Sequence, residues 1–251
     1  MTKKITYRVV SPTRFIDFLS RFSAIEPTLL VELEDGDMKA KTYTADRAVV
    51  KFSKMGLNEA FDVIDGNDEN LMFGLVSIDK FTSSLKNFKD GSFDMTIEYA
   101  DIEGKNIGTK ITVHNKRLTL DFDCASFRLF THITDELFNE KIAEINGSYD
   151  AQFNITEDAF SEISSVSKID ADYKLISLST ANKEVRVKGK MFDLQVLESA
   201  DVNETGITFY KHHFGLVERE DSLVQIGTDK LVFSSSESET VTVVGSSDDD
   251  E

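Results

Sequence analysis

The sequence contains no tryptophan, only 2 prolines and a single cysteine among its 251 residues. One thiol cannot form an internal disulfide or a cysteine-rich metal site, so both are excluded. Cys124 lies in the apolar-rich run "LTLDFDCASFRLF", where we expect it to be a small buried hydrophobic residue. The scarcity of proline favours long regular elements, because proline interrupts helices and central strands.

Positive charge is also scarce. The 28 lysines and arginines face 45 aspartates and glutamates, which gives a formal net charge of −17. Such a charge repels DNA from most of the surface and argues against a broad basic patch that binds nucleic acid. No stretch approaches the roughly 18 apolar residues of a membrane span, and the N-terminal "MTKKITYRVV" lacks the apolar core of a signal peptide. The sequence therefore predicts an intracellular protein with no membrane partner.

Motifs that carry catalysis or bind metals are missing as well. None of the four histidines (His114, His132, His212 and His213) has a cysteine or an acidic residue at metal-ligand spacing. The acidic stretch "DGNDEN" at 65–70 lacks the glycine and the flanking helices of a calcium loop. No phosphate-binding, dinucleotide-binding or nucleophile-elbow motif occurs. We therefore predict a protein that is not an enzyme and that uses no metal and no cofactor.

Most of the chain alternates polar and apolar residues with a period of two, which is typical of half-buried strands. "TLLVELED" and "MKAKTYTA" flank Gly36 as a hairpin, and the same pattern continues through "RLTLDFD" and "SFRLFTHI", which ends at residue 133. In the second half it returns in segments such as "KEVRVKGK" and "ETVTVVG". These patterns predict a strand-dominated α+β protein.

A few short helices interrupt the strands. The first, over 12–22, has Ser11 as its N-cap and Pro12 at its first position, and Ser77 caps the second, over 78–90. Thr156 caps the third, and a weaker fourth around 209–221 is interrupted by Gly215. The first three carry apolar stripes: Phe15, Phe18, Leu19 and Phe22; Ile78, Phe81, Leu85 and Phe88; Ala159, Phe160, Ile163 and Val166.

The order of these elements suggests an internal duplication. Each half reads strand, helix, several strands, helix, several strands. We expect one domain over 1–133, an interdomain connector over 134–150, a second domain over 151–245 and an acidic tail over 246–251.

The lysines and arginines on the four helices are the other feature of the sequence that needs an explanation. They form either an ordinary solvated surface or a set of positive charges kept for a purpose.

The chain resembles the DNA sliding clamps of the two-domain type, which include proliferating cell nuclear antigen and the clamps of T4-like phages. "TRFIDFLSRF" is similar to the opening helix of that family, "TYTADRAVVKF" to the strand–turn–strand that follows, "VSIDKFTSSLKNF" to the second helix, and "ETVTVVGSSDDDE" to the terminal strand and acidic tail. The resemblance implies two domains, each a pair of β-α-β-β-β units, with sheets outside and helices lining a ring. It also implies a homotrimer that encircles double-stranded DNA and tethers a DNA polymerase.

The same resemblance assigns residues. The channel residues it implies are Arg14, Arg21, Lys80 and Lys86, followed by Lys89, Lys168 and Lys211. Weak phosphate contacts that do not depend on sequence would suit a ring that must slide. The third helix departs from the family, because it offers Glu162, Ser164 and Ser165 where relatives usually carry basic residues. The partner-peptide pocket it implies consists of Tyr43, Arg47, Ala48, Val49, Leu137, Phe138, Val243 and Val244.

As a clamp, the protein would act at replication forks, in the cytoplasm of a bacterial host if a phage encodes it, and would need a clamp loader. Three alternatives stay open. A monomeric processivity factor would hold DNA with a more basic face, which the net charge of −17 disfavours. A β-rich structural or adaptor protein, such as a virion component, would have no role on DNA. An enzyme whose site the sequence does not reveal is the third.

Overall fold

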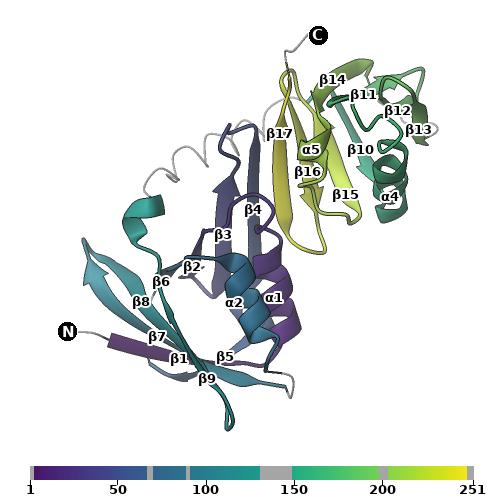
Figure 1. Ribbon diagram of the computed structural model, residues 1–251. Helices are drawn as coiled ribbons and strands as arrows, with labels where there is room; N and C mark the ends of the chain where they lie inside the picture. Colours follow the sequence, from purple (N-terminus) through teal and green to yellow (C-terminus); the bar gives the residue numbers. More distant parts are fainter. Residues whose placement is uncertain (1–2, 67–69, 89–90, 131–148, 198–202, 248–251) are drawn as a thin grey trace. The chain divides into compact units, whose positions relative to one another are not determined.

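The computed structural model describes residues 3–66, 70–88, 91–130, 149–197 and 203–247 (Figure 1). They belong to two compact units. The first unit is built from 1–42 and 52–135, and the second from 43–51 and 136–251. No helix within the described ranges has the length and apolar character needed to cross a membrane.

The first unit contains two α-helices, two 3₁₀ turns and nine strands in its described part. The elements are β1 Lys3–Val9, α1 Pro12–Ser20, β2 Leu29–Glu34, β3 Asp37–Tyr43, β4 Val49–Gly56, η1 Leu57–Glu59, β5 Phe61–Asp65, β6 Leu71–Leu75, α2 Ile78–Leu85, β7 Phe93–Ile102, β8 Lys105–His114, β9 Thr119–Asp123 and η2 Phe127–Phe130. Strand β4 begins in the second unit and ends in the first.

The strands of the first unit form two groups. One has the order β4-β3-β2-β6, and the other has the order β5-β1-β7-β8-β9. A short parallel pair between Met72 of β6 and Ile107 of β8 joins them. The β2–β3 hairpin turns at Asp35 and Gly36, whose φ angles of 54° and 82° are those a tight two-residue turn requires. The predicted hairpin around Gly36 is therefore confirmed.

The second unit repeats much of this order. Its elements are β10 Ala151–Ile155, α4 Glu157–Val166, β11 Leu175–Ala181, β12 Glu184–Lys188, β13 Asp193–Leu197, β14 Thr205–Tyr210, α5 Lys211–Phe214, β15 Ser222–Ile226, β16 Lys230–Ser235 and β17 Thr240–Gly245. They form one group β10-β15-β16-β17 and a separate group β13-β12-β11-β14. The start of β4 lies beside β17 in the first of these groups.

Strand pairing confirms the predicted duplication of architecture. The order β1-β7-β8-β9 of the first unit matches β10-β15-β16-β17 of the second, and β4-β3-β2-β6 matches β13-β12-β11-β14. The helices match too, because α1 follows β1 as α4 follows β10, and α2 follows β6 as α5 follows β14. Strand β5 has no counterpart among the described elements of the second unit.

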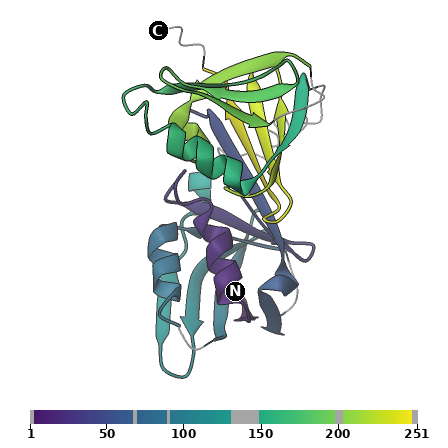
Figure 2. The ribbon, with the colours of Figure 1, turned by 90° about the vertical axis from the view of Figure 1, so that its right-hand side faces the viewer.

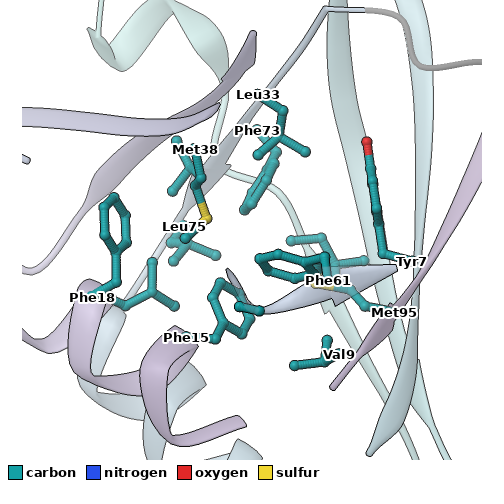
Figure 3. Packing of buried hydrophobic residues seen from close by; sticks show 14 of the residues in the cluster. Tyr7, Val9, Phe15, Phe18, Leu33, Met38, Phe61, Phe73, Leu75 and Met95 are labelled. Atoms are coloured by element: carbon teal, nitrogen blue, oxygen red, sulfur yellow. The ribbon is translucent and has the colours of Figure 1, made fainter. Parts of the chain in front are cut away.

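Helices α1 and α2 lie side by side against the sheet of the first unit (Figures 1 and 2). The buried stripe of α1 meets inward residues of β1, β6 and β7 (Figure 3), and the stripe of α2 belongs to the same core cluster. Phe15 packs edge-on against Phe61, with ring centroids 4.9 Å apart, and Tyr7 packs against the same ring at 5.8 Å. In the second unit Phe160 of α4 stacks on Phe214 of α5 at 5.4 Å. Burial of these aromatic rings is the main force that holds each helix on its sheet.

The helix caps agree with the sequence prediction in two of three cases. Ser77 and Thr156 accept hydrogen bonds from the backbone N–H groups of Lys80 and Ala159, both at 3.3 Å. Ser11 occupies the N-cap position, but its hydroxyl accepts no capping hydrogen bond. The described helices are shorter than predicted. Phe22 and Phe88 are buried in the turns that follow α1 and α2, and the fourth helix, expected around 209–221, spans only Lys211–Phe214.

Some predictions about the elements were wrong or incomplete. Residues Phe127–Phe130, expected to continue a strand, form a 3₁₀ turn with Phe130 buried. The pattern also missed the short strands β5, β6 and β14, and the end of β14 overlaps the start of the predicted fourth helix. The sequence did not separate residues 43–51 from the first domain, although they belong to the second compact unit. Most of the predicted connector (134–150) and of the acidic tail (246–251) lies outside the described residues, and the predicted domain boundaries stay predictions.

Candidate DNA-facing helices and partner surface

The exposed faces of α1 and α2 carry both signs of charge. Arg14 and Asp17 project from α1, opposite its buried stripe. On α2 the exposed charged residues are Asp79 and Lys80, with Lys86 at the C-cap. In the described part of the chain Lys80 and Lys86 have no carboxylate partner. These two lysines are therefore the cations of α2 and its C-cap that are available to an outside anion.

The two arginines of α1 are already engaged within the first unit. Arg14 forms an ion pair with Glu59 of η1, on the surface. Arg21 donates a hydrogen bond from Nη1 to Ser53 Oγ at 3.1 Å, and its guanidinium lies 5.9 Å from the centre of the Phe18 ring. Arg21, expected to face a channel, is instead half-buried at the C-cap, where β4 offers it a hydroxyl.

The helices of the second unit differ in charge. The exposed residues of α4 include Glu157, Asp158 and Glu162, and the only exposed cation near its end is Lys168. Lys211, expected to face a channel, instead donates from Nζ to the carbonyls of Ser167 at 3.2 Å and Asp170 at 2.7 Å. Its ammonium closes the turn after α4, so this residue has a structural role. Lys89 lies outside the described residues.

The tip of the β3–β4 hairpin is a compact turn that packs within the second unit. Asp46 Oδ1 accepts hydrogen bonds from the Thr44 hydroxyl and from the backbone N–H of Ala48, the latter at 3.0 Å. Arg47 follows with φ of 60°, and its guanidinium lies 5.9 Å from the Tyr43 ring centre. These contacts fix the turn and leave Arg47 exposed.

The alternation of side chains along β4 and β17 decides which residues of the predicted partner pocket are accessible. Val49 and Val244 are fully buried on the inward side, so they belong to the core and cannot receive a peptide in this conformation. Val243 lies on the opposite side, with Val50, Tyr149, Val232 and Val241 around it. We call these five residues the outer patch.

Sequence reasoning missed four members of the outer patch: Val50, Tyr149, Val232 and Val241. The alternation in "RAVVKF" could have indicated Val50, since only one of two consecutive valines can face the core. In the patch Val50, Tyr149 and Val241 are half-exposed. Burial raises the pKa of Tyr149, and the charge of Lys230 partly offsets that effect. Leu137 and Phe138, the connector residues of the predicted pocket, lie outside the described residues.

A buried histidine lies beneath the hairpin tip. The His213 side chain is 1% exposed, and its Nε2 is 3.5 Å from Asp46 Oδ2, too far for a good hydrogen bond. Burial lowers the pKa of His213, the charge of His212 lowers it further, and Asp46 opposes both effects. The arrangement favours a neutral imidazole under the turn.

The single thiol has no features of a reactive site. Cys124 is half-buried against the core of the first unit. Desolvation, with a smaller contribution from Asp123, raises the pKa of Cys124 to about 12. Within the described ranges no group of three or more histidine, cysteine or acidic side chains is placed to hold a metal ion.

Comparison with known proteins gives the fold. No protein-family model and no curated protein sequence matches the chain. Among solved structures, the chain is similar to the PCNA2–PCNA3 complex of Sulfolobus tokodaii, with a TM-score of 0.67 and 11% identity over 96% of this chain and 98% of the other. It is also similar to A. fulgidus PCNA bound to the C-terminal region of FEN-1, with a TM-score of 0.68 and 10% identity over 98% and 100%. The chain therefore has the DNA sliding-clamp fold.

Proposed function

We propose that this protein is a DNA polymerase processivity factor, a sliding clamp that closes around duplex DNA as a homotrimer. The observation that carries the proposal is the duplicated strand order. The second unit contains a junction between β4 and β17, and the strands that correspond to these two by the duplication can form the same kind of junction between two copies of the chain. The role is not enzymatic and needs no cofactor. It would be carried out inside the cell, at replication forks.

Ring closure is supported by the strands at the edges. The start of β4 lies along β17, and the Gly245 N–H donates to the Ala48 carbonyl at 2.7 Å. By the duplication, β13 is the counterpart of β4 and β9 is the counterpart of β17. In the described part of the chain β13 and β9 each pair on one side only. A second copy can therefore place its β13 along β9 by the same kind of junction.

Such an interface is head-to-tail, because the two surfaces that meet are different, and repetition around an axis closes it into a ring. Closure would also cover two open strand edges, which otherwise invite aggregation. Met191, just before β13, is 71% exposed, the highest value among the large hydrophobic residues that the structure describes. An interface at β13 would give this side chain an apolar neighbour.

Contact with DNA would depend mainly on the first unit. Lys80 and Lys86 are exposed on α2, whereas the exposed face of α4 is acidic. Since Lys211 is bound to backbone carbonyls, Lys168 is the remaining candidate in the second unit. A ring holds DNA topologically, so a few weak phosphate contacts are sufficient and strong attraction would hinder sliding.

The outer patch is the proposed site for polymerases and the clamp loader. It combines half-exposed apolar side chains with a rigid turn that carries Tyr43 and Arg47, a composition typical of protein interfaces. The A. fulgidus structure contains the C-terminal region of FEN-1, which is a precedent for a short partner segment on this fold.

Two other functions predict different behaviour. A monomeric processivity factor would bind DNA through a basic face and would dissociate from circular and linear DNA alike. A structural or adaptor protein with this fold would show no retention on DNA at all. The net charge of −17 disfavours the first, and the exposed lysines of α2 favour a DNA role over the second.

The first experiment is the molar mass in solution, measured by light scattering over a range of concentrations. We expect three copies for the natural sequence and a loss of assembly for Val196→Glu, which places a charge on β13. The matched control is Val63→Glu on the edge strand β5, which should leave the mass unchanged. A stable dimer, or equal effects of the two substitutions, would count against the ring.

The second experiment is retention on nicked circular DNA compared with linear DNA. A ring stays on the circle and slides off the free ends. The double variant Lys80→Glu with Lys86→Glu should shorten retention, while Lys183→Glu, in the exposed β11–β12 turn, should not. Equal retention on linear and circular DNA would reject the topological mechanism.

A further inference from the structure

A polar cleft lies at one end of the sheet in the first unit, on the side away from α1 and α2. It has a volume of about 460 Å³ and is formed where β1 ends, β7 begins and β8 turns toward β9. Its lining residues are Arg8, Ser92, Phe93, Asp94, His114, Asn115 and Lys116. None of these residues belongs to the proposed DNA or polymerase surfaces, so the cleft calls for its own explanation.

Strand register explains why three charged or polar side chains meet there. Arg8 pairs across the sheet with Asp94, and Asp94 pairs with His114. Their neighbours Val9, Phe93 and Val113 are buried on the helix side. Because side chains alternate along a strand, the polar row must project from the opposite face. The three strands run side by side in Figure 1.

The one carboxylate of the cleft is already neutralised. Arg8 donates from Nε to Asp94 Oδ1 at 3.0 Å and from Nη2 to Oδ2 at 3.4 Å. The hydrogen bond to Asp94 raises the pKa of Arg8, and the charges of Asp94 and of Asp62, which lies opposite Arg8 on β5, add to the effect. Both oxygens of Asp94 face the same guanidinium, so the carboxylate does not serve as the partner of His114 or Lys116.

The turn after β8 holds the remaining donors in place. Asn115 Oδ1 accepts hydrogen bonds from the backbone N–H groups of Arg117 at 2.8 Å and Leu118 at 2.9 Å. With its oxygen committed to the turn, the Asn115 side chain has only its NH₂ group left to offer a ligand. Lys116 is exposed at the tip and has no ion pair within the described ranges.

We propose that this cleft binds an acidic peptide segment of a partner protein. Lys116, Asn115, Ser92 and His114 supply donors for carboxylates. The volume is in the usual range for sites that hold ligands larger than a single ion. The net charge of −17 repels acidic segments from most of the surface. An acidic peptide can therefore dock only where hydrogen-bond donors outnumber carboxylates, as they do among the residues that line this cleft.

The test is a titration of a fluorescein-labelled hexaglutamate peptide with the full-length protein, followed by fluorescence anisotropy at low salt. The site gives saturable binding that Lys116→Glu weakens about tenfold or more, the effect of losing one charge-assisted hydrogen bond. The matched control is Lys183→Glu, which makes the same change of charge in another exposed turn and should change the affinity less than about twofold.

A gain of affinity gives a second readout that misfolding cannot imitate. Asp94→Asn removes the only carboxylate among the lining residues and frees the Arg8 guanidinium from its hydrogen bonds, although the charge of the exposed Asp62 still acts on Arg8. The peptide should therefore bind more tightly. No saturable binding, equal losses for Lys116→Glu and Lys183→Glu, or weaker binding of Asp94→Asn would each overturn the proposal. Full displacement by inorganic phosphate at low millimolar concentration would also overturn it, because a small ion would then be the ligand. The assay contains no DNA, so its outcome is independent of the clamp function.

Discussion

Removal of Glu218 should destabilise the protein far more than removal of its partner, Lys51. The Lys51 ammonium lies 2.7 Å from Glu218 Oε1. The Lys51 side chain is 3% exposed and that of Glu218 is 21% exposed. Glu218→Ala therefore takes a counter-charge away from an ammonium group that water hardly reaches. Lys51→Met removes the buried charge and keeps an unbranched apolar chain.

The expected magnitudes follow from burial. Removing one partner of a buried ion pair costs about 3–5 kcal/mol. Because the Glu218 carboxylate is partly open to water, we expect about 2–4 kcal/mol for Glu218→Ala. Replacing the buried charge with an apolar chain is often close to neutral, so Lys51→Met should cost about 0–1.5 kcal/mol. The asymmetry between the two variants is the prediction.

The assay is urea denaturation followed by circular dichroism at a fixed protein concentration. Glu98→Ala is the matched control, since its partner Lys4 has a side chain 62% exposed and such surface pairs contribute about 0–1 kcal/mol. The reasoning is refuted if Glu218→Ala costs no more than Glu98→Ala, or if Lys51→Met is the more damaging of the two variants.

Three further predictions concern single side chains. Thr156→Ala should lower the free energy of unfolding by about 1 kcal/mol, because Thr156 caps α4, whereas Ser11→Ala should change it by less than about 0.5 kcal/mol, and urea denaturation measures both. Cys124 should react with a thiol reagent at about pH 8 at least a hundredfold more slowly in the folded protein than in urea, since its raised pKa keeps the thiolate rare. Burial lowers the pKa of His213 in the folded protein. As the pH falls, the histidine is therefore protonated first in the unfolded chain, and the stability due to neutral His213 is lost below about pH 6.5. The urea midpoint should accordingly drop more from about pH 7.5 to about pH 5.5 in the natural protein than in His213→Phe, and equal drops would contradict the assignment.

Most of the fold could be predicted from local patterns in the sequence. The Asp35–Gly36 turn could be predicted because few residue pairs accept positive φ at two consecutive positions. Ser77 and Thr156 could be placed at helix starts because their hydroxyls satisfy N–H groups that a helix leaves open. The repeated order of strands and helices was visible because both halves must bury similar amphipathic elements.

The candidate sites were harder, because they depend on partners far along the chain. Nothing near Lys211 in the sequence indicates that the carbonyls of Ser167 and Asp170 bind its ammonium. Arg21 likewise finds Ser53 only after β4 is in place. The outer patch depends on which of two adjacent valines faces inward, and that choice is made by the pairing of β4 rather than by composition.

The path of β4 has a practical consequence for dividing the protein. Residues 43–51 belong to the second compact unit, but they come before most of the first unit in the chain. A fragment cut within 134–150 would contain β10 to β17 without the strand that lies along β17, and Thr240–Gly245 would become an open edge. Val50 would be missing from the outer patch as well. The two halves share an architecture, yet no single cut gives two complete folding units.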